Sequence, residues 1–137
     1  MNNPFFSVIV PCHNSAEFMR KGLESIRSQD FQDYELLIVC DRCEDNTADI
    51  ARDYIRTDHP DRVLTVDFGR AGLSRNAALD VARGEWVLFM DDDDWYLPVG
   101  IGTAVVDHGF VLVGHGHILV DKRPASRFYS CFGCCGG

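Results

Sequence analysis

The sequence predicts an α/β domain in which a mostly parallel sheet is connected by helical crossovers. Apolar runs of strand length alternate along the chain with segments of helical period. The runs are nearly continuous, which is typical of strands buried on both faces. Three of them are followed at once by polar residues, as expected where ligands bind at the carboxyl ends of parallel strands. Together these patterns favour strands that alternate with helices in an open sheet.

The expected elements lie before the run of aspartates that begins at Asp91. The predicted strands span residues 5–10, 34–40, 62–66 and 85–90, and the predicted helices span residues 16–28, 47–56 and 73–82. We expect Pro11 to close the first strand, Asn14 and Ser15 to cap the first helix, and Gly84 to cap the third helix at its C-terminus. Later apolar runs at 105–106, 110–113 and 118–120 suggest short strands between glycines.

Composition and charge limit the classes of function. The 137 residues are 46% hydrophobic and 25% charged, which is ordinary for one globular domain and excludes collagen-like, mucin-like and fully disordered chains. A net charge of −8 predicts no nucleic-acid partner. The apolar runs are far shorter than the ~20 residues of a membrane-spanning helix. Residues 1–4 carry no basic charge typical of a secretory signal, so we expect a cytoplasmic location, free or at the inner face of a membrane.

The six cysteines favour reduced thiols over a disulfide framework, because we expect a cytoplasmic chain. One alternative is a zinc site formed by residues near the C-terminus, namely Cys131, Cys134, Cys135, His115 and His117. Their spacing matches no standard zinc finger. We therefore favour a Gly-rich terminal tail.

Three polar segments are expected to converge on one edge of the sheet. The segment Pro11-Cys12-His13-Asn14 follows the first strand, Asp41 follows the second, and Asp91 to Asp94 follow the fourth. Like charges as close as these four aspartates repel one another unless a cation neutralises them. Carboxylates are hard ligands that suit Mg²⁺ or Mn²⁺, and both ions also prefer phosphate oxygens. A solvated acidic turn is the alternative, but the position after a buried strand favours a metal.

Two sets of motifs resemble the N-terminal half of glycosyltransferase family 2. The first set is Ser7-Val8-Ile9-Val10-Pro11 with Asn14, then Glu35-Leu36-Leu37-Ile38-Val39 with Asp41, Asp45 and Thr47. The second is Gly72-Leu73-Ser74-Arg75-Asn76-Ala77, then Gly84-Glu85-Trp86-Val87-Leu88-Phe89-Met90 and the aspartates. The resemblance covers residues 5 to 98 and implies an inverting, sugar-nucleotide-dependent enzyme with the Rossmann-like GT-A fold.

The resemblance also implies roles for single residues. Pro11 and His13 match positions that line the nucleotide base, with Asn14 beside them. Asp41 matches a carboxylate that accepts the imide N–H of uracil, and Arg75 matches a basic position near the nucleotide. The metal-binding region covers Asp91, Asp93 and Asp94, while Asp92 and Asp93 are expected to contact the sugar nucleotide. Cys40 departs from the family, which usually has another aspartate there.

The implied function is metal-dependent transfer of a sugar, with inversion, from a nucleoside-diphosphate donor. A UDP-sugar is the expected donor, Mn²⁺ or Mg²⁺ the expected cofactor, and a glycan, lipid or protein the acceptor. We expect residues 1–98 to form the donor-binding region and residues 99–137 to be a short remnant of the acceptor side, so that the fold is truncated after the Asp-rich loop.

No catalytic base is assigned, because Asp107 and Asp121 are the only carboxylates after Pro98 and neither has a recognisable setting. We therefore expect UDP binding with slow transfer or none, unless a second copy of the chain or a membrane-associated partner completes the site. One alternative function is a catalytically incomplete sugar-nucleotide-binding module. A nucleotidyltransferase ranks third, because the first strand is not followed by a Gly-rich phosphate loop with a lysine.

Overall fold

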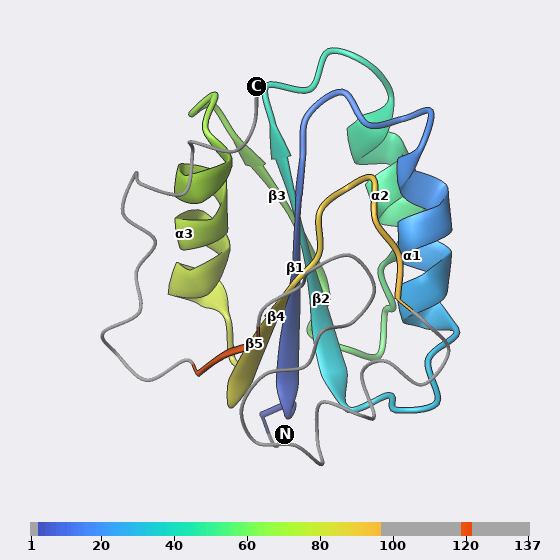
Figure 1. The fold of residues 1–137 in the computed structure, drawn as a ribbon, viewed down its shortest axis with the longest axis vertical. Helices are drawn as coiled ribbons and strands as arrows, with labels where there is room; N and C mark the ends of the chain where they lie inside the picture. Colours follow the sequence, from blue (N-terminus) through green and yellow to red (C-terminus); the bar gives the residue numbers. More distant parts are fainter. Residues whose placement is uncertain (1–2, 97–118, 122–137) are drawn as a thin grey trace.

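A five-stranded sheet organises the computed structural model, which describes residues 3–96 and 119–121 (Figure 1). The strands are β1 (Phe6–Cys12), β2 (Tyr34–Asp41), β3 (Arg62–Val66), β4 (Trp86–Phe89) and β5 (Leu119–Asp121). Their spatial order is β3-β2-β1-β4-β5. The first four strands are parallel, and β5 pairs antiparallel to β4. The predicted mostly parallel sheet is therefore confirmed.

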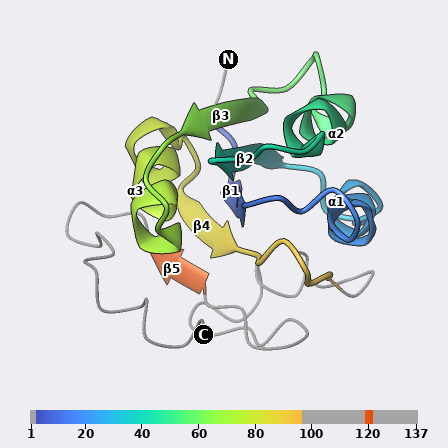
Figure 2. The same cartoon turned by 90° about the horizontal axis from the view of Figure 1, so that it is seen from above.

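Three helices cover the two faces of this sheet. They are α1 (Met19–Arg27), α2 (Thr47–Tyr54) and α3 (Ala71–Val81). Helices α1 and α2 lie on one face and α3 lies on the other (Figure 2). Each helix follows one strand and precedes the next, as a parallel connection requires. The carboxyl ends of all four parallel strands consequently point to the same end of the molecule, the upper end in Figure 1.

Each face of the sheet has its own apolar core. On α1, the residues Met19, Leu23 and Ile26 recur at helical spacing and are fully buried against the side of the sheet that carries Val8 and Val10. On the opposite face, α3 buries small side chains, including Ala78, against Ile9 and other strand residues. Both cores include residues of β1 and β2, and these two strands are buried along their whole length.

β1 continues through Pro11 to Cys12, so the prediction that this proline closes the strand is wrong. The reason lies in the neighbouring strand. Pairing between β1 and β4 ends at Ile9 and Phe89, and the Ile9 carbonyl accepts the backbone N–H of Met90 at 3.0 Å. Backbone groups at positions 9 and 11 face the same neighbour. An N–H at position 11 would therefore point beyond the end of β4, where it has no partner strand. Proline is tolerated there because no hydrogen bond of the sheet is lost.

The prediction that Asn14 and Ser15 cap the first helix is also wrong, because α1 begins at Met19 with no side-chain cap. Asn14 has a φ of 45°, and its side-chain oxygen accepts the backbone N–H of Glu44 at 2.8 Å. The Ser15 hydroxyl donates instead to Asp92 in the loop after β4. Both side chains therefore connect loops at the upper end of the sheet.

Gly84 is not the expected left-handed cap. Helix α3 ends at Val81, and Gly69 is the positive-φ glycine in the described part of the chain. A Cβ atom on Gly84 would lie 2.4 Å from the backbone nitrogen of Ser7. Gly84 also donates its N–H to the Ser7 hydroxyl at 2.8 Å. The position needs glycine because the turn before β4 packs directly on the β1 backbone.

Several expectations fall partly or wholly outside the described residues. These are the strands at 105–106 and 110–113 and the alternative zinc site near the C-terminus. The expected strand at 118–120 appears one residue later, as β5. Cys12, Cys40 and Cys43 carry free thiols. Among the residues in view, no helix has the length and apolar character needed to cross a bilayer.

Candidate functional site

A cavity of about 490 Å³ opens at the carboxyl ends of β1, β2 and β4. The strand order reverses direction between β1 and β4, which is where ligands bind in open α/β sheets. The cavity is lined by Pro11, Cys12, His13, Asp41, Arg42, Gly69, Arg70, Ala71, Ser74, Arg75, Asp91, Asp92 and Asp93. Every predicted site residue except Asn14 and Asp94 thus lines the cavity.

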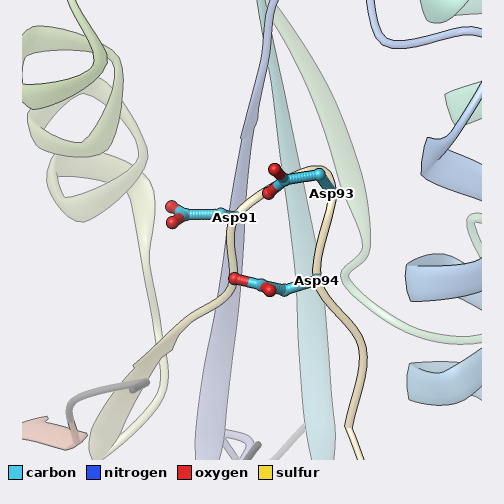
Figure 3. A group of neighbouring side chains, drawn as sticks. All are labelled: Asp91, Asp93 and Asp94. Carbon is cyan, nitrogen blue, oxygen red and sulfur yellow. The ribbon is translucent and has the colours of Figure 1, made fainter. Parts of the chain in front are cut away.

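The aspartate segment forms a turn that gathers three of its four carboxylates. The backbone N–H of Asp94 donates to the Asp91 carbonyl at 3.1 Å and closes the turn. Carboxylate oxygens of Asp91, Asp93 and Asp94 all lie within 4.8 Å of one another. Figure 3 shows Asp93 and Asp94 directed back across the turn toward the side that carries Asp91. Three hard oxygen donors are therefore available at one point.

Asp92 is separated from this group and faces the loop after β1. It accepts hydrogen bonds from the Ser15 hydroxyl and, at 3.4 Å, from the backbone N–H of His13. Burial raises the pKa of Asp92, and the charges of Asp93 and Asp91 add to that effect, while the two hydrogen bonds oppose it. The role of Asp92 in this arrangement is to hold the aspartate turn against β1.

Basic side chains also line the cavity. Arg75 donates from Nη2 to Asp91 at 2.9 Å, and its side chain is only 18% exposed. Arg42 and Arg70 also line the cavity. The sequence reasoning missed these two arginines. Arg42 comes directly after Asp41 at the end of the second strand, and Arg70 follows the third strand. Ligands bind at the carboxyl ends of parallel strands, so a search of all residues that follow each predicted strand would have identified both arginines.

Asp41 is 5% exposed and accepts four hydrogen bonds. The backbone N–H groups of Phe68 and Gly69 donate to Oδ1 at 2.8 and 2.9 Å. The backbone N–H of Arg70 and the hydroxyl of Ser74 donate to Oδ2 at 3.1 and 2.9 Å. Burial acts to raise the pKa of Asp41, but these hydrogen bonds outweigh it and lower the pKa below 3.8. The carboxylate thus fastens the loop that leads into α3.

His13 is directed toward the cavity, whereas Cys40 belongs to the apolar core. The Nδ1 atom of His13 lies 2.7 Å from the Asp41 carbonyl oxygen, which can only accept, so Nδ1 carries the proton. His13 lines the cavity, and its contact with a nucleotide base stays a prediction. Cys40, in contrast, points into the core beneath α1 and α2, where burial raises its pKa to about 12. A neutral thiol there leaves Asp41 as the carboxylate at the end of β2.

Comparison with known proteins identifies the family of this chain. Residues 7–105 match the model of glycosyl transferase family 2. The chain is 39% identical over 120 residues to the poly(ribitol-phosphate) beta-N-acetylglucosaminyltransferase TarS of Staphylococcus aureus, covering 85% of this chain and 20% of that protein.

Solved structures extend the likeness to the fold. A crystal structure of part of S. aureus TarS with UDP-GlcNAc matches with a TM-score of 0.69 and 35% identity, over 77% of this chain and 30% of that one. The mannosyltransferase PcManGT of Pyrobaculum calidifontis, in complex with GDP-Man and Mn²⁺, matches with a TM-score of 0.68 and 25% identity, over 77% and 32%. The chain thus spans less than half the length of these proteins. It belongs to glycosyltransferase family 2.

Proposed function

We propose that this chain binds a UDP-sugar together with Mn²⁺ or Mg²⁺ and forms the donor site of a glycosyltransferase. The observation that carries the proposal is one cavity that is lined both by carboxylates of the turn after β4 and by Arg75. A diphosphate is strongly negative, and a protein of net charge −8 must offset that charge locally. The carboxylates would do so through a bound metal ion, and the arginine would do so directly. The TarS complex with UDP-GlcNAc, at 35% identity, supports UDP as the nucleotide.

The residues present fit a divalent metal ion. Asp91, Asp93 and Asp94 would hold it, since their oxygens lie within 4.8 Å of one another and are the hard donors that Mg²⁺ and Mn²⁺ prefer. When bound, the ion would supply Lewis-acid stabilisation of the departing diphosphate. The match to a neighbour solved with Mn²⁺ agrees with this choice of metal.

Arg75 and the start of α3 would bind the phosphates from one wall of the cavity. Arg75 already contacts Asp91 and lines the cavity, so its guanidinium can neutralise charge on both the carboxylate and an incoming diphosphate. Ala71 and Ser74 place the first turn of α3 on the same wall. Helix N-termini present backbone N–H groups that favour anions.

Among the residues that the structure describes, no carboxylate lining the cavity is left over to act as the base. Asp41 and Asp92 hold loops through their hydrogen bonds, and Asp91 and Asp93 belong to the metal group. Donor binding is therefore the function that we propose for this region. Proton transfer from the acceptor then belongs to residues other than these.

Thermal unfolding of the full chain tests the metal-dependent site. We expect UDP to raise the melting temperature in the presence of Mn²⁺ and to leave it unchanged in EDTA, because a ligand stabilises only the state that binds it. The substitution Asp94→Ala should remove the UDP-dependent shift. Asp49→Ala is the matched control, since Asp49 is a highly exposed carboxylate on α2, away from the cavity lining.

Two results would contradict the proposal in different ways. Equal stabilisation by UDP in EDTA would remove the metal from the donor site. Absence of stabilisation by UDP, GDP and CDP, each with Mn²⁺, would show that the cavity does not bind a nucleoside diphosphate at all.

A further inference from the structure

Arg42 lines the cavity in an unusual backbone conformation. Its φ is 53°, in the left-handed region that long side chains rarely adopt. The position is held because its backbone N–H donates to the Val66 carbonyl at 3.1 Å, which extends the pairing of β2 and β3. Backbone strain of this kind persists where the surrounding structure holds it, and it concentrates at functional sites. In this conformation the Arg42 side chain lies against the loop after β3.

The guanidinium group of Arg42 is seated against that loop. Its Nε donates to the carboxylate of Asp67. A Cβ atom on Gly69 would lie 2.6 Å from Nη1 and 3.0 Å from Cζ of the arginine, so the group packs directly on the glycine backbone. Gly69, with a φ of 66°, is itself anchored by its N–H to Asp41. The side chain of Arg42 nevertheless remains 56% exposed.

The order of the strands separates Arg42 from the aspartate turn. Arg42 follows β2 and the aspartate turn follows β4, with β1 between them. Neighbouring strands lie about 4.8 Å apart, so the ends of β2 and β4 are separated by roughly 10 Å. A diphosphate held at the aspartate turn leaves space for its nucleoside in the part of the same cavity that Arg42 lines. A planar, weakly hydrated guanidinium stacks well on the face of a nucleobase.

We propose that Arg42 covers the nucleobase of the donor and helps to determine which base is accepted, with Asp67 and Gly69 as its positioning residues. This inference rests on the proposed donor function. It assigns Arg42 to the base and not to the phosphates. A phosphate contact would depend on the charge of Arg42, whereas a stacking contact depends on the plane of its guanidinium. The two kinds of contact can therefore be distinguished by experiment.

Calorimetric titration of the full chain in Mn²⁺ tests the assignment with two ligands, UDP and inorganic pyrophosphate, which is a diphosphate without a base. The variants are Arg42→Lys, which keeps the charge and loses the plane, Arg42→Gln, and Asp67→Ala, which frees the arginine without altering it. Arg52→Ala is the matched control, because Arg52 is 57% exposed and paired with Asp49, as Arg42 is 56% exposed and paired with Asp67.

We expect Arg42→Gln, which loses the cation, to weaken UDP binding by roughly 3-fold to 30-fold, the range for a cation on an aromatic face. Arg42→Lys keeps the charge but loses the planar stacking group, so it should weaken UDP binding by a smaller factor. Both variants should change pyrophosphate binding by less than about 2-fold. Asp67→Ala should weaken UDP binding in the same sense by a smaller factor. Arg52→Ala should alter neither ligand. Melting curves of each variant without ligand establish that it is folded.

Three outcomes would overturn the inference. Equal loss for UDP and pyrophosphate would make Arg42 a phosphate contact. Full UDP affinity in Arg42→Lys would show that charge alone suffices, and unchanged UDP affinity in all three variants would remove Arg42 from the site. If the unaltered chain bound neither ligand, the proposed donor function itself would fail, which is a different result from any of these.

Discussion

Asp41 connects two loops of the site through different atoms. Its carboxylate accepts four hydrogen bonds from the segment that runs from Phe68 to Ser74, and its carbonyl accepts the Nδ1–H of His13. A carboxylate has acceptor positions for about four donors, so all of them are occupied. Contact with the imide N–H of a base, the role implied for Asp41 by family resemblance, stays a prediction. It requires one of these four donors to give way.

The substitution Asp41→Asn should therefore affect stability as well as binding. The amide keeps the shape but presents donors to Arg70 or Ser74, so we expect a loss of about 1–3 kcal/mol in the free energy of unfolding at pH 7. UDP affinity should fall as well, because the loop lining the cavity loosens.

The stability loss should depend on pH in a defined direction. Hydrogen bonds hold the pKa of Asp41 below 3.8 in the folded chain, against the opposing effect of burial. The ionised carboxylate thus stabilises the fold above that pH, and this stabilisation disappears as the pH falls through the lowered pKa. Urea unfolding at pH 7, 5 and 3 checks this, with Asp49→Asn as the exposed control. A deficit of the same size at every pH would contradict it.

At the scale of elements, α1 determines where the aspartate turn lies. Gly22 is buried on α1, and a Cβ atom there would lie 2.4 Å from the Asp94 carbonyl oxygen and 2.9 Å from the terminal methyl of Met90. The turn after β4 therefore packs on the helix backbone itself. The missing side chain allows Asp94 to come within reach of Asp91 and Asp93.

The substitution Gly22→Ala should reverse the usual effect of alanine in a helix. Alanine favours helices over glycine by about 1 kcal/mol, but here overpacking should cost about 1–3 kcal/mol and displace the turn. We expect a lower melting temperature and weaker Mn²⁺-dependent UDP binding. Gly72→Ala on α3 is the control, because its Cβ would meet nothing within 4 Å. Equal behaviour of the two variants would show that the turn does not depend on this contact.

At the scale of the whole molecule, the two central strands carry both the core and the site. β1 is paired on both sides, by β2 and β4, and β2 is paired by β1 and β3. Both are buried along their full length, whereas the residues of β3 are half-buried or exposed. The polar loops of the cavity consequently rest on the least accessible part of the sheet.

Hydrogen exchange of backbone amides should report this arrangement directly. We expect the slowest exchange in β1 and β2 and faster exchange in β3, because amides in doubly paired, buried strands exchange only through large-scale unfolding. Mass spectrometry of peptides from each strand measures it. Protection of β3 equal to that of β2 would contradict the expectation. Adding UDP with Mn²⁺ should further slow exchange in the segments around Asp41 and Asp91.

The succession of strands and helices along the chain, and the edge of the sheet that carries the candidate site, were predictable from local sequence patterns. These features are encoded locally, because a continuous apolar run such as that of β2 specifies a buried strand wherever it packs. The polar residues after each run then fall at the carboxyl edge by the geometry of parallel connections. That edge, together with the aspartates on it, was predictable from residue order alone.

Which side chains meet at that edge depends on contacts between segments that are distant in the sequence. Asp92 is separated from its three neighbours because Ser15, 77 positions away in the sequence, takes its carboxylate. Gly84 is required by the backbone of Ser7 and not by a helix end. Arg42 gains its place from Asp67 and Gly69 on another loop. Local patterns carry no record of such contacts, because each depends on how two distant segments pack after the sheet has formed.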